Sequence, residues 1–226
     1  MREVVLDTET TGLSPDEGHR IVEVAAVELV DRRPTGRHFH AYLNPGRPMP
    51  PEAAAVHGLT DSFLADKPPF SAVADALLAF LEAAPVVAHN AAFDARFLAF
   101  ELEAAGRPAL PPDRFVDTVE LARRRFPGAK HSLDALCARF GIDLSVRAQH
   151  GALTDARLLA EVYVELTGGR QIRLDLAPGR TAVASGAPAR APRPARLFSP
   201  TAEEEAAHAR FIEGIPNALW RTLPGH

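Results

Sequence analysis

The chain has 226 residues, of which 46% are hydrophobic, enough for one folded core of roughly 150 to 200 residues and some further segments. The formal net charge of −4 argues against a broad basic platform for nucleic acid. The single cysteine excludes an internal disulfide, and the sequence has no signal-peptide or membrane-spanning run. These features predict a cytoplasmic protein with no membrane partner.

The charge is distributed unevenly along the chain. Counting Lys, Arg, Asp and Glu, residues 1–169 carry a net charge of −7, residues 170–196 carry +5 and residues 197–226 carry −2. An acidic body is what a site built from carboxylates requires. Such a body can still bind DNA when metal ions and local arginines screen the phosphates.

The first predicted elements are strands. The apolar run 4–6, the Val- and Ile-rich run 21–30 and the run 39–43 predict three strands, with a turn formed by Asp31-Arg32-Arg33-Pro34 after the second. The short connections favour an antiparallel meander.

Helices and strands alternate after this meander. Apolar residues at helical spacing predict the helices, and prolines and glycines end them. The predicted elements are a helix over 72–84, a strand at 86–88, a helix over about 92–105, a strand at 115–116 with a helix after it, and helices over 133–140 and 152–166. Together they predict an α/β fold, a mixed five-stranded sheet flanked by helices, in which the first, fourth and fifth strands lie parallel.

Four acidic residues and one histidine lie in three short motifs. Asp7 and Glu9 stand at the end of the first strand, Asp94 follows the fourth, and His150 and Asp155 mark the final helix. Strand ends of an open sheet usually hold ligands, so we expect these side chains to share one cleft. All-oxygen ligands favour Mg²⁺ or Mn²⁺ over zinc, and a neighbouring histidine suits a base that deprotonates water. The set predicts metal-assisted hydrolysis of a phosphodiester.

Each motif also has an ordinary structural explanation. An acidic residue at a strand end is often a turn former, Asp94 alone is typical of a solvated helix face, and His150 alone of a helix cap. The occurrence of all three motifs, in order and each at a strand–helix junction or on the final helix, favours the catalytic interpretation.

The three motifs, VLDTETTGL, HNAAFDARFL and HGALTDA, resemble those of the DEDDh family of 3′→5′ exonucleases. The resemblance covers about residues 3–168 and implies a ribonuclease-H-like fold. It further implies that Asp7, Glu9, Asp94 and Asp155 hold two Mg²⁺ or Mn²⁺ ions and that His150 is the general base. The implied products are 5′-mononucleotides released one at a time.

The resemblance also implies contacts with the 3′ end of a DNA strand. Leu13 would lie between the last two bases, and His57 would approach the terminal sugar. Apart from the resemblance, we expect Phe93 to stack on a base and Asn90 to contribute to substrate binding. The alternatives are packing for Leu13 and Phe93, a loop position for His57, and capping of the following helix for Asn90.

The sequence predicts four segments: a nuclease domain over 1–169, a short peptide over 170–176, a flexible linker rich in Ala, Pro and Arg over 177–196, and a C-terminal docking segment over 197–226. The short peptide contains Gln171, Leu174 and Leu176 at the spacing of peptides that bind the bacterial sliding clamp.

The C-terminal segment begins with Thr201-x-x-Glu204, which predicts a capping box and a short helix. Too short to form a core alone, it is expected to dock on a partner through large apolar side chains. The expected anchors are Phe211, Ile212, Leu219 and Trp220.

The order of these segments resembles the proofreading (epsilon) subunits of bacterial DNA polymerase III. This resemblance implies the catalytic polymerase subunit and the sliding clamp as partners. Two alternatives remain open at this stage: an exoribonuclease that trims or degrades RNA, and a scaffold without catalysis that bridges polymerase and clamp.

Overall fold

The computed structural model describes residues 1–145, 150–168 and 199–216. The chain divides into two compact units, Met1–Leu174 and Asp175–His226. The first unit contains all three sequence motifs. The described part of the second unit consists of one helix and its ends. No helix in the described part of the chain is long and apolar enough to cross a membrane.

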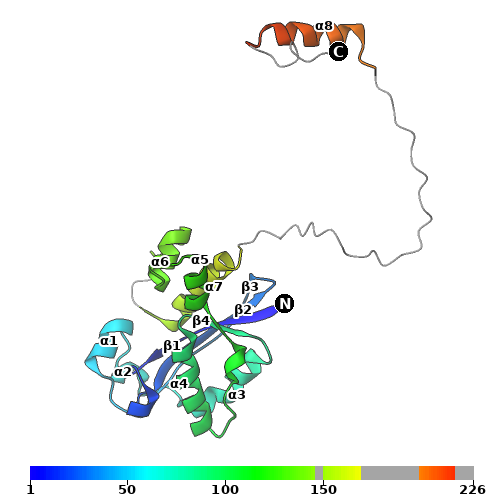
Figure 1. Cartoon of the computed structure of the whole chain (residues 1–226). Coiled ribbons are helices and arrows are strands. Elements are labelled where there is room, and N and C mark those ends of the chain that lie inside the picture. The colour runs from blue at the N-terminus through cyan, green and yellow to red at the C-terminus, as the bar shows by residue number, and fades with distance from the viewer. Residues whose placement is uncertain (146–149, 169–198, 217–226) are drawn as a thin grey trace, which may run out of the picture. The chain divides into compact units, whose positions relative to one another are not determined.

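The first unit is built on a mixed five-stranded sheet with the order β3-β2-β1-β4-β5 (Figure 1). The central strand β1 pairs antiparallel with β2 and parallel with β4, and β4 pairs parallel with β5. The meander and the three parallel strands predicted from the sequence are confirmed. The strands are β1 (Arg2–Thr10), β2 (Ile21–Val30), β3 (Arg33–Tyr42), β4 (Val86–Ala88) and β5 (Phe115–Asp117).

The connection between β2 and β3 is tighter than the sequence suggested. Asp31 and Arg32 have φ of 50° and 61°, so two residues reverse the chain. Strand β3 therefore begins at Arg33, whereas the apolar pattern predicted a strand only from 39. The first half of this edge strand is exposed, so it lacks the apolar residues that would reveal it, and an edge strand tolerates Pro34.

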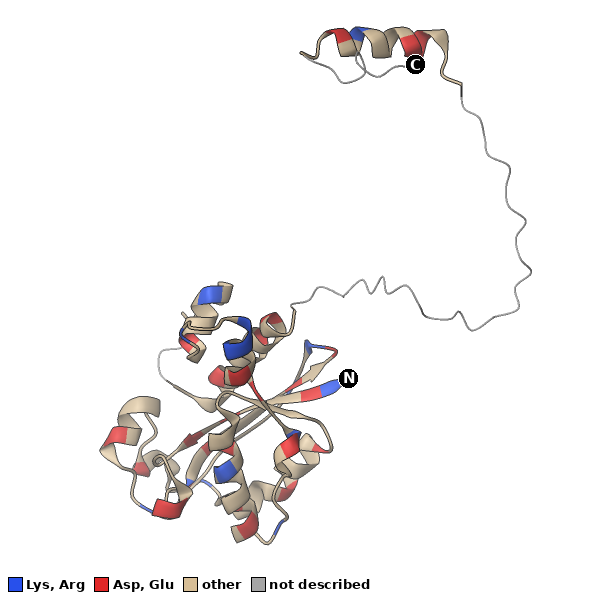
Figure 2. Cartoon of the chain, viewed as in Figure 1, with Lys and Arg blue, Asp and Glu red and all other residues tan. Residues whose placement is uncertain are grey.

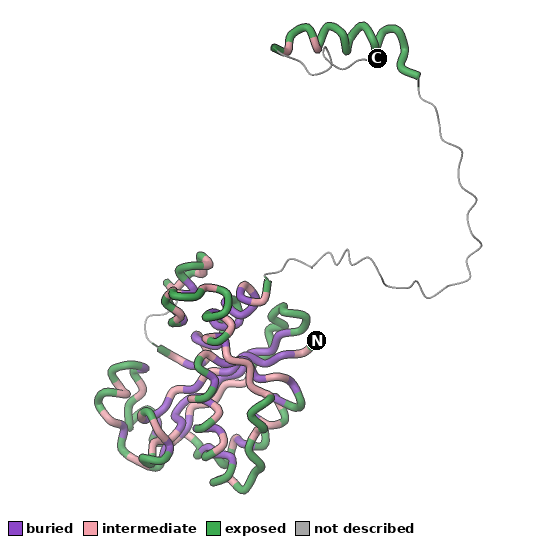
Figure 3. Tube along the Cα trace, viewed as in Figure 1, coloured by how far each residue is buried: buried purple, intermediate pink, exposed green. Residues whose placement is uncertain are grey.

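Helices cover both faces of the sheet, and Figure 3 shows the strands as the buried centre of the unit. Helices α3 and α4 pack with Val4 and Leu6 of β1 on one face, and α5, α6 and α7 pack with Val5 on the other. The helices are α1 (Pro51–His57), α2 (Asp61–Leu64), α3 (Phe70–Leu81), α4 (Ala91–Ala104), α5 (Thr118–Arg125), α6 (Leu133–Phe140) and α7 (Ala152–Leu166), with 3-10 turns η1 (Pro15–Glu17) and η2 (Pro112–Arg114).

Two short helices were not predicted. Helix α1 has Pro50 before it and no side-chain cap, and α2 is a single turn in which Thr60 Oγ1 accepts the N–H of Phe63. Both are too short to show a clear apolar repeat. Helix α3 was predicted over 72–84 but ends at Leu81, because Glu82 adopts a φ of 44° and turns the chain.

The alternation of β1 decides which side chains reach the α7 side of the sheet. Successive side chains of a strand point to opposite faces, so Asp7 and Glu9 share the face of Val5. On the neighbouring strand, Ala25 lies opposite Asp7 and packs against the first turns of α7 at Ala152. The end of the central strand is thereby placed beside the start of α7.

The second unit contains α8 (Ala202–Glu213). Thr201 Oγ1 accepts a hydrogen bond from the N–H of Glu204, and the side chain of Glu204 accepts one from the N–H of Thr201. The predicted capping box is confirmed.

Candidate active site

Helix α4 brings the second acidic motif, which contains Asp94, to the end of β1 beside the start of α7. The chain leaves β4 through Asn90, whose φ of 63° lies in the left-handed region that asparagine tolerates better than most residues. The N–H of Asn90 donates to Asp117 Oδ1 over 3.1 Å, which fixes this sharp turn. Asp94 follows in the first turn of α4, and only 3% of its surface is exposed. Thr8 Oγ1 on β1 donates to Asp94 Oδ1 over 2.7 Å and links the strand to the helix.

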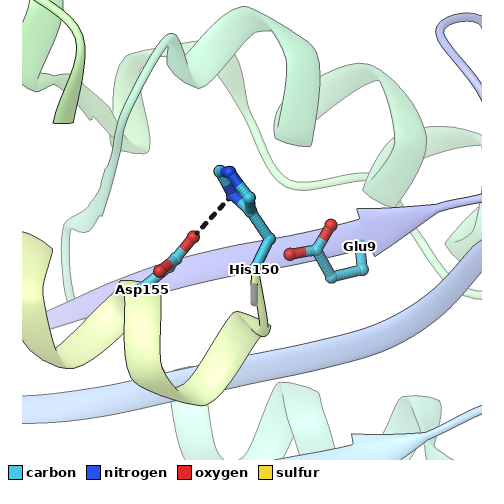
Figure 4. A group of neighbouring side chains, drawn as sticks. All are labelled: Glu9, His150 and Asp155. Atoms are coloured by element: carbon cyan, nitrogen blue, oxygen red, sulfur yellow. Dashed lines mark hydrogen bonds and ion pairs between the residues drawn. The ribbon is translucent and has the colours of Figure 1, made fainter. Parts of the chain in front are cut away.

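Helix α7 supplies the third motif. Figure 4 shows His150 and Asp155 reaching the site from the start of α7, and Glu9 reaching it from β1. His150 Nδ1 lies 3.2 Å from Asp155 Oδ2. One ligand atom from each of Glu9, His150 and Asp155 lies within 4.8 Å of the others, a spacing that suits a shared metal ion. The structure therefore brings the three motifs together from three separate elements.

The carboxylates of the site repel one another. Burial raises the pKa of Asp7 well above its usual value, and four neighbouring carboxylates add to the shift. In decreasing order of effect they are Asp94, Glu9, Asp155 and Glu23. Burial also raises the pKa of Asp94 to about 7, although the hydrogen bond from Thr8 acts in the opposite direction. Burial and mutual repulsion among the described residues thus disfavour the ionised forms of Asp7 and Asp94.

This donor set fits a divalent metal ion. Buried carboxylates with raised pKa values provide the charge that a cation would offset, and oxygen ligands are those preferred by Mg²⁺ and Mn²⁺. The resemblance of the motifs to the DEDDh family implies the use of divalent metal ions, and the side chains of this site fit such ions.

Glu23 is an acidic residue of this site that the sequence did not single out. It lies directly opposite Glu9 in the β1–β2 ladder, and only 3% of its surface is exposed. Its Oε1 is 2.7 Å from His40 Nε2 on β3. A Cβ placed on Gly151, the residue before α7, would lie 3.9 Å from Glu23 Oε2. A buried charge within a predicted strand was the available signal, but only the strand register shows that it faces the site.

His57 lies at the end of α1, not in a loop, and is buried, with 6% of its surface exposed. Its Nδ1 accepts a hydrogen bond from the N–H of Leu59 over 3.1 Å, which assigns the ring proton to Nε2. Burial lowers the pKa of His57, while a backbone group of Thr10 and the charge of Glu23 oppose the shift. Among the described residues Nε2 makes no hydrogen bond of regular geometry, although the backbone of Thr10 is close enough to favour the protonated ring. A buried N–H group of this kind, near the site, is suited to a substrate oxygen.

The other predicted substrate contacts have different environments in the structure. Leu13 follows β1 and is 81% exposed, so it packs little against the protein. Phe93 is partly buried in the core beside α3 and lies 5.0 Å from Phe97 between ring centroids. Asn90 occupies the N-cap position of α4, but its side chain makes no capping hydrogen bond. Packing is thus part of the role of Phe93, whereas neither packing nor capping accounts for the side chains of Leu13 and Asn90.

The predicted partner contacts fall largely outside the described residues. Gln171, Leu174 and Leu176 of the clamp-like peptide lie there, as does the linker over 177–196. Leu219 and Trp220 of the C-terminal segment lie there too. Of the four expected polymerase anchors, the structure describes Phe211, which is 69% exposed, and Ile212, both on α8.

Comparisons with known proteins agree with the motifs. The exonuclease (RNase_T) family model matches residues 4–163. The chain is 53% identical to the DNA polymerase III subunit epsilon of Rickettsia prowazekii (strain Madrid E) over 174 residues, which is 76% of each chain. It is 43% identical to the DNA polymerase III subunit epsilon of Escherichia coli (strain K12) in an alignment of 236 positions that covers 97% of each chain.

Solved structures agree with the fold. Exonuclease X in complex with 5′ overhanging duplex DNA is 30% identical, with a TM-score of 0.58 over 73% of this chain and 90% of that one. The nuclease domain of 3′hExo, a DEDDh family member bound to rAMP, shares the fold with a TM-score of 0.64 over 74% of this chain and 91% of that one, at 17% identity. The ribonuclease-H-like prediction is confirmed, and the chain belongs to the exonuclease family and, within it, to the epsilon subunits of DNA polymerase III.

Proposed function

We propose that this chain is a 3′→5′ exonuclease that removes mispaired 3′-terminal nucleotides of DNA as 5′-mononucleotides, acting as the proofreading subunit of a bacterial replicative polymerase. The observation that carries this proposal is the convergence of Asp7, Glu9, Asp94, Asp155 and His150 in one site. Membership of the epsilon family over nearly the whole chain supports the choice of DNA as substrate.

Asp7, Glu9, Asp94 and Asp155 would hold two Mg²⁺ or Mn²⁺ ions. When bound, such a pair of ions lowers the pKa of an attacking water and stabilises the leaving 3′ oxygen. The raised pKa values of Asp7 and Asp94 support this assignment, because a cation at the site would favour their ionised forms.

His150 would be the general base. Asp155 Oδ2, 3.2 Å from Nδ1, orients the ring, so Nε2 is the atom that would take the proton from water. An imidazole is the side chain best suited to exchange a proton near neutral pH. Asp155 would thus have two tasks, binding metal and orienting the base.

Substrate contacts would come from the residues around the site. His57 Nε2–H would donate to a sugar or phosphate oxygen of the terminal nucleotide, which would satisfy a buried donor. The exposed Leu13 would lie against the last bases, with Phe93 and Asn90 on the α4 side. None of these contacts reads a base sequence. Selectivity for errors would come from the DNA, because a mispaired 3′ end separates more readily into the single strand that the site needs.

The remaining segments would tether this nuclease domain, residues 1–169, to its partners. Residues 170–176 would bind the sliding clamp and residues 197–226 the catalytic subunit of the polymerase, with residues 177–196 as the flexible connection. A tether raises the effective concentration of the nuclease at the primer end without new contacts at the site.

The test is digestion of a 5′-labelled primer–template, paired or mismatched at its 3′ end, beside an RNA strand of equal length. It is run with Mg²⁺, with chelator and with the variant Asp7→Ala. The proposal expects stepwise 3′ trimming of DNA, faster at the mismatch and lost in both controls. A preference for RNA would instead support RNA maturation or turnover. Absence of turnover on every substrate would support a scaffold that bridges polymerase and clamp.

A further inference from the structure

The loop over residues 11–20, called here the β1–β2 loop, connects the strand that carries Asp7 and Glu9 to β2. It contains Leu13, whose side chain is 81% exposed. A single exposed leucine is common on protein surfaces and by itself indicates no function. This leucine differs from an ordinary surface residue because the loop around it is held to the rest of the unit at three places.

The two ends of the β1–β2 loop are joined to each other and to α4. The N–H of Thr11 donates to the carbonyl oxygen of Arg20 over 2.9 Å, and the N–H of Arg20 donates to Thr11 Oγ1 over 3.0 Å. Arg20 also donates from Nε and Nη2 to the two carboxylate oxygens of Glu101 on α4, at 2.8 and 2.6 Å. Only 1% of the surface of Glu101 is exposed, so this bidentate ion pair fixes the base of the loop to the interior of the unit.

The residue before Leu13 packs against a histidine ring. A Cβ added to Gly12 would lie 2.3 to 2.5 Å from three ring atoms of His19, so another residue would fit there only if the ring moved. His19 Nδ1 lies 3.1 Å from Thr11 Oγ1, a hydrogen bond that holds the ring in this place. Thr10 Oγ1, at the end of β1, donates to the carbonyl oxygen of Gly12 over 2.6 Å. The backbone on the N-terminal side of Leu13 is thereby fixed.

Arg96 holds the chain on the other side of Leu13. It lies on α4, two residues after Asp94, and supplies the blue segment of that helix in Figure 2. Its Nη2 donates to Ser14 Oγ and to Asp16 Oδ2, each over 3.0 Å. Ser14 directly follows Leu13 and caps the 3-10 turn η1 by accepting the N–H of Asp16. One guanidinium group therefore ties α4 to the residues that come directly after Leu13.

The stability of the fold explains the buried pair of Arg20 and Glu101 better than it explains the contact of Arg96. The side chains of Arg96 and Asp16 are 56% and 82% exposed, and an ion pair so exposed contributes little to stability. Such a contact can still fix a local conformation. The β1–β2 loop is already held at its base, so one further tie of small free energy is sufficient to favour a single arrangement of the residues around Leu13.

We propose that Arg96 is a positioning residue, whose hydrogen bonds to Ser14 and Asp16 hold the β1–β2 loop in the arrangement in which Leu13 contacts the last bases of the bound strand. The inference rests on the proposed nuclease function, which gives Leu13 that contact. An ordered loop favours binding, because a side chain that is already in place loses less conformational entropy when the strand arrives. Arg96 acts through Leu13 and makes no contact of its own with the strand.

The test uses the full-length protein and the variant Arg96→Gln, with Arg96→Lys as the conservative variant. The matched control is Arg107→Gln, which removes another exposed ion pair, the one that Arg107 makes with Asp75 just beyond the far end of α4. Steady-state kinetics on a short single strand of DNA with Mg²⁺ give kcat and KM. The NMR order parameter of the Leu13 amide measures the order of the loop without any substrate.

Arg96→Gln should raise KM roughly three- to fivefold and leave kcat unchanged, because the carboxylates of the site keep their places. Arg96→Lys should restore part of the loss. Leu13→Ala should also raise KM, and adding Arg96→Gln to Leu13→Ala should change KM no further. An equal effect of the control, a loss in kcat instead of KM, or a further rise of KM in the double variant would overturn the inference. The last result would mean that Arg96 binds the strand directly.

The order parameter decides about the loop independently of turnover. It should be about 0.85 for the Leu13 amide in the wild type and in the control, and lower in Arg96→Gln. A value below about 0.6 in the wild type, or equal values in the wild type and Arg96→Gln, would overturn the inference. Absence of wild-type turnover would contradict the proposed function instead, and the order parameters would still decide whether Arg96 fixes the loop.

Discussion

The raised pKa of Asp94 predicts that this carboxylate destabilises the metal-free fold at neutral pH. Its pKa is about 7 in the folded chain, against 3.8 for an ordinary aspartate. Between these two values the folded state binds the proton and the unfolded state does not, so the free energy of unfolding falls as pH rises from about 4 to about 7. Three pKa units at about 1.4 kcal/mol each give a loss of about 4 kcal/mol.

Asp94→Asn removes this cost and keeps an oxygen that can accept the hydrogen bond from Thr8. We therefore expect the variant to be more stable than the wild type in chelator, by a few kcal/mol above pH 7 and by less than about 1 kcal/mol near pH 4. Urea unfolding of both proteins at a series of pH values measures the difference. Added Mg²⁺ should stabilise the wild type more than the variant, because only the wild type retains the full set of carboxylates.

Glu28→Gln is a control of opposite sign. Glu28 on β2 is a buried carboxylate like Asp94, but hydrogen bonds from Arg2 and Thr35 hold its pKa below its usual value. Its replacement should destabilise the protein at pH 7. The reasoning about Asp94 would be refuted if Asp94→Asn were no more stable than the wild type at pH 8, or if its advantage were the same at pH 4 as at pH 8.

Three further predictions address the site and the tail. Glu23→Gln removes the buried charge beside Glu9 and His40. It should lower kcat roughly tenfold and leave KM and the melting temperature nearly unchanged. A kcat equal to that of the wild type would show that Glu23 only supports the fold. His57→Asn should raise KM about fivefold for a lost hydrogen bond of about 1 kcal/mol and leave kcat intact, in steady-state kinetics on a short DNA strand; a change in kcat alone would contradict a substrate contact. A truncation at Gly169 should retain turnover and lose both partners, and co-migration of the truncated protein with the polymerase subunit in gel filtration would contradict the role of the tail.

Local sequence was sufficient for the elements with strong apolar repeats and for the chemistry of the site. The helices over 133–140 and 152–166 and the strand at 86–88 occur as predicted, because their apolar spacing and the glycines or proline beside them act within a few residues. The three motifs identified the family, since the residue types that bind metal and move a proton are themselves the signal. The capping box of α8 was likewise a local pattern.

Tertiary structure decided which other side chains join the site. Glu23 faces Glu9 because of the β1–β2 register, and a shift of one residue would have turned its side chain to the other face. Thr8 reaches Asp94 across 86 positions of sequence, and α1 brings His57 near Glu23. Such relations depend on which elements pack together and in which register, and burial then sets the pKa values. The sequence alone was sufficient to identify the acidic residues and the histidine of the proposed site. Only the packed fold determined which side chains surround them and how strongly the carboxylates repel one another.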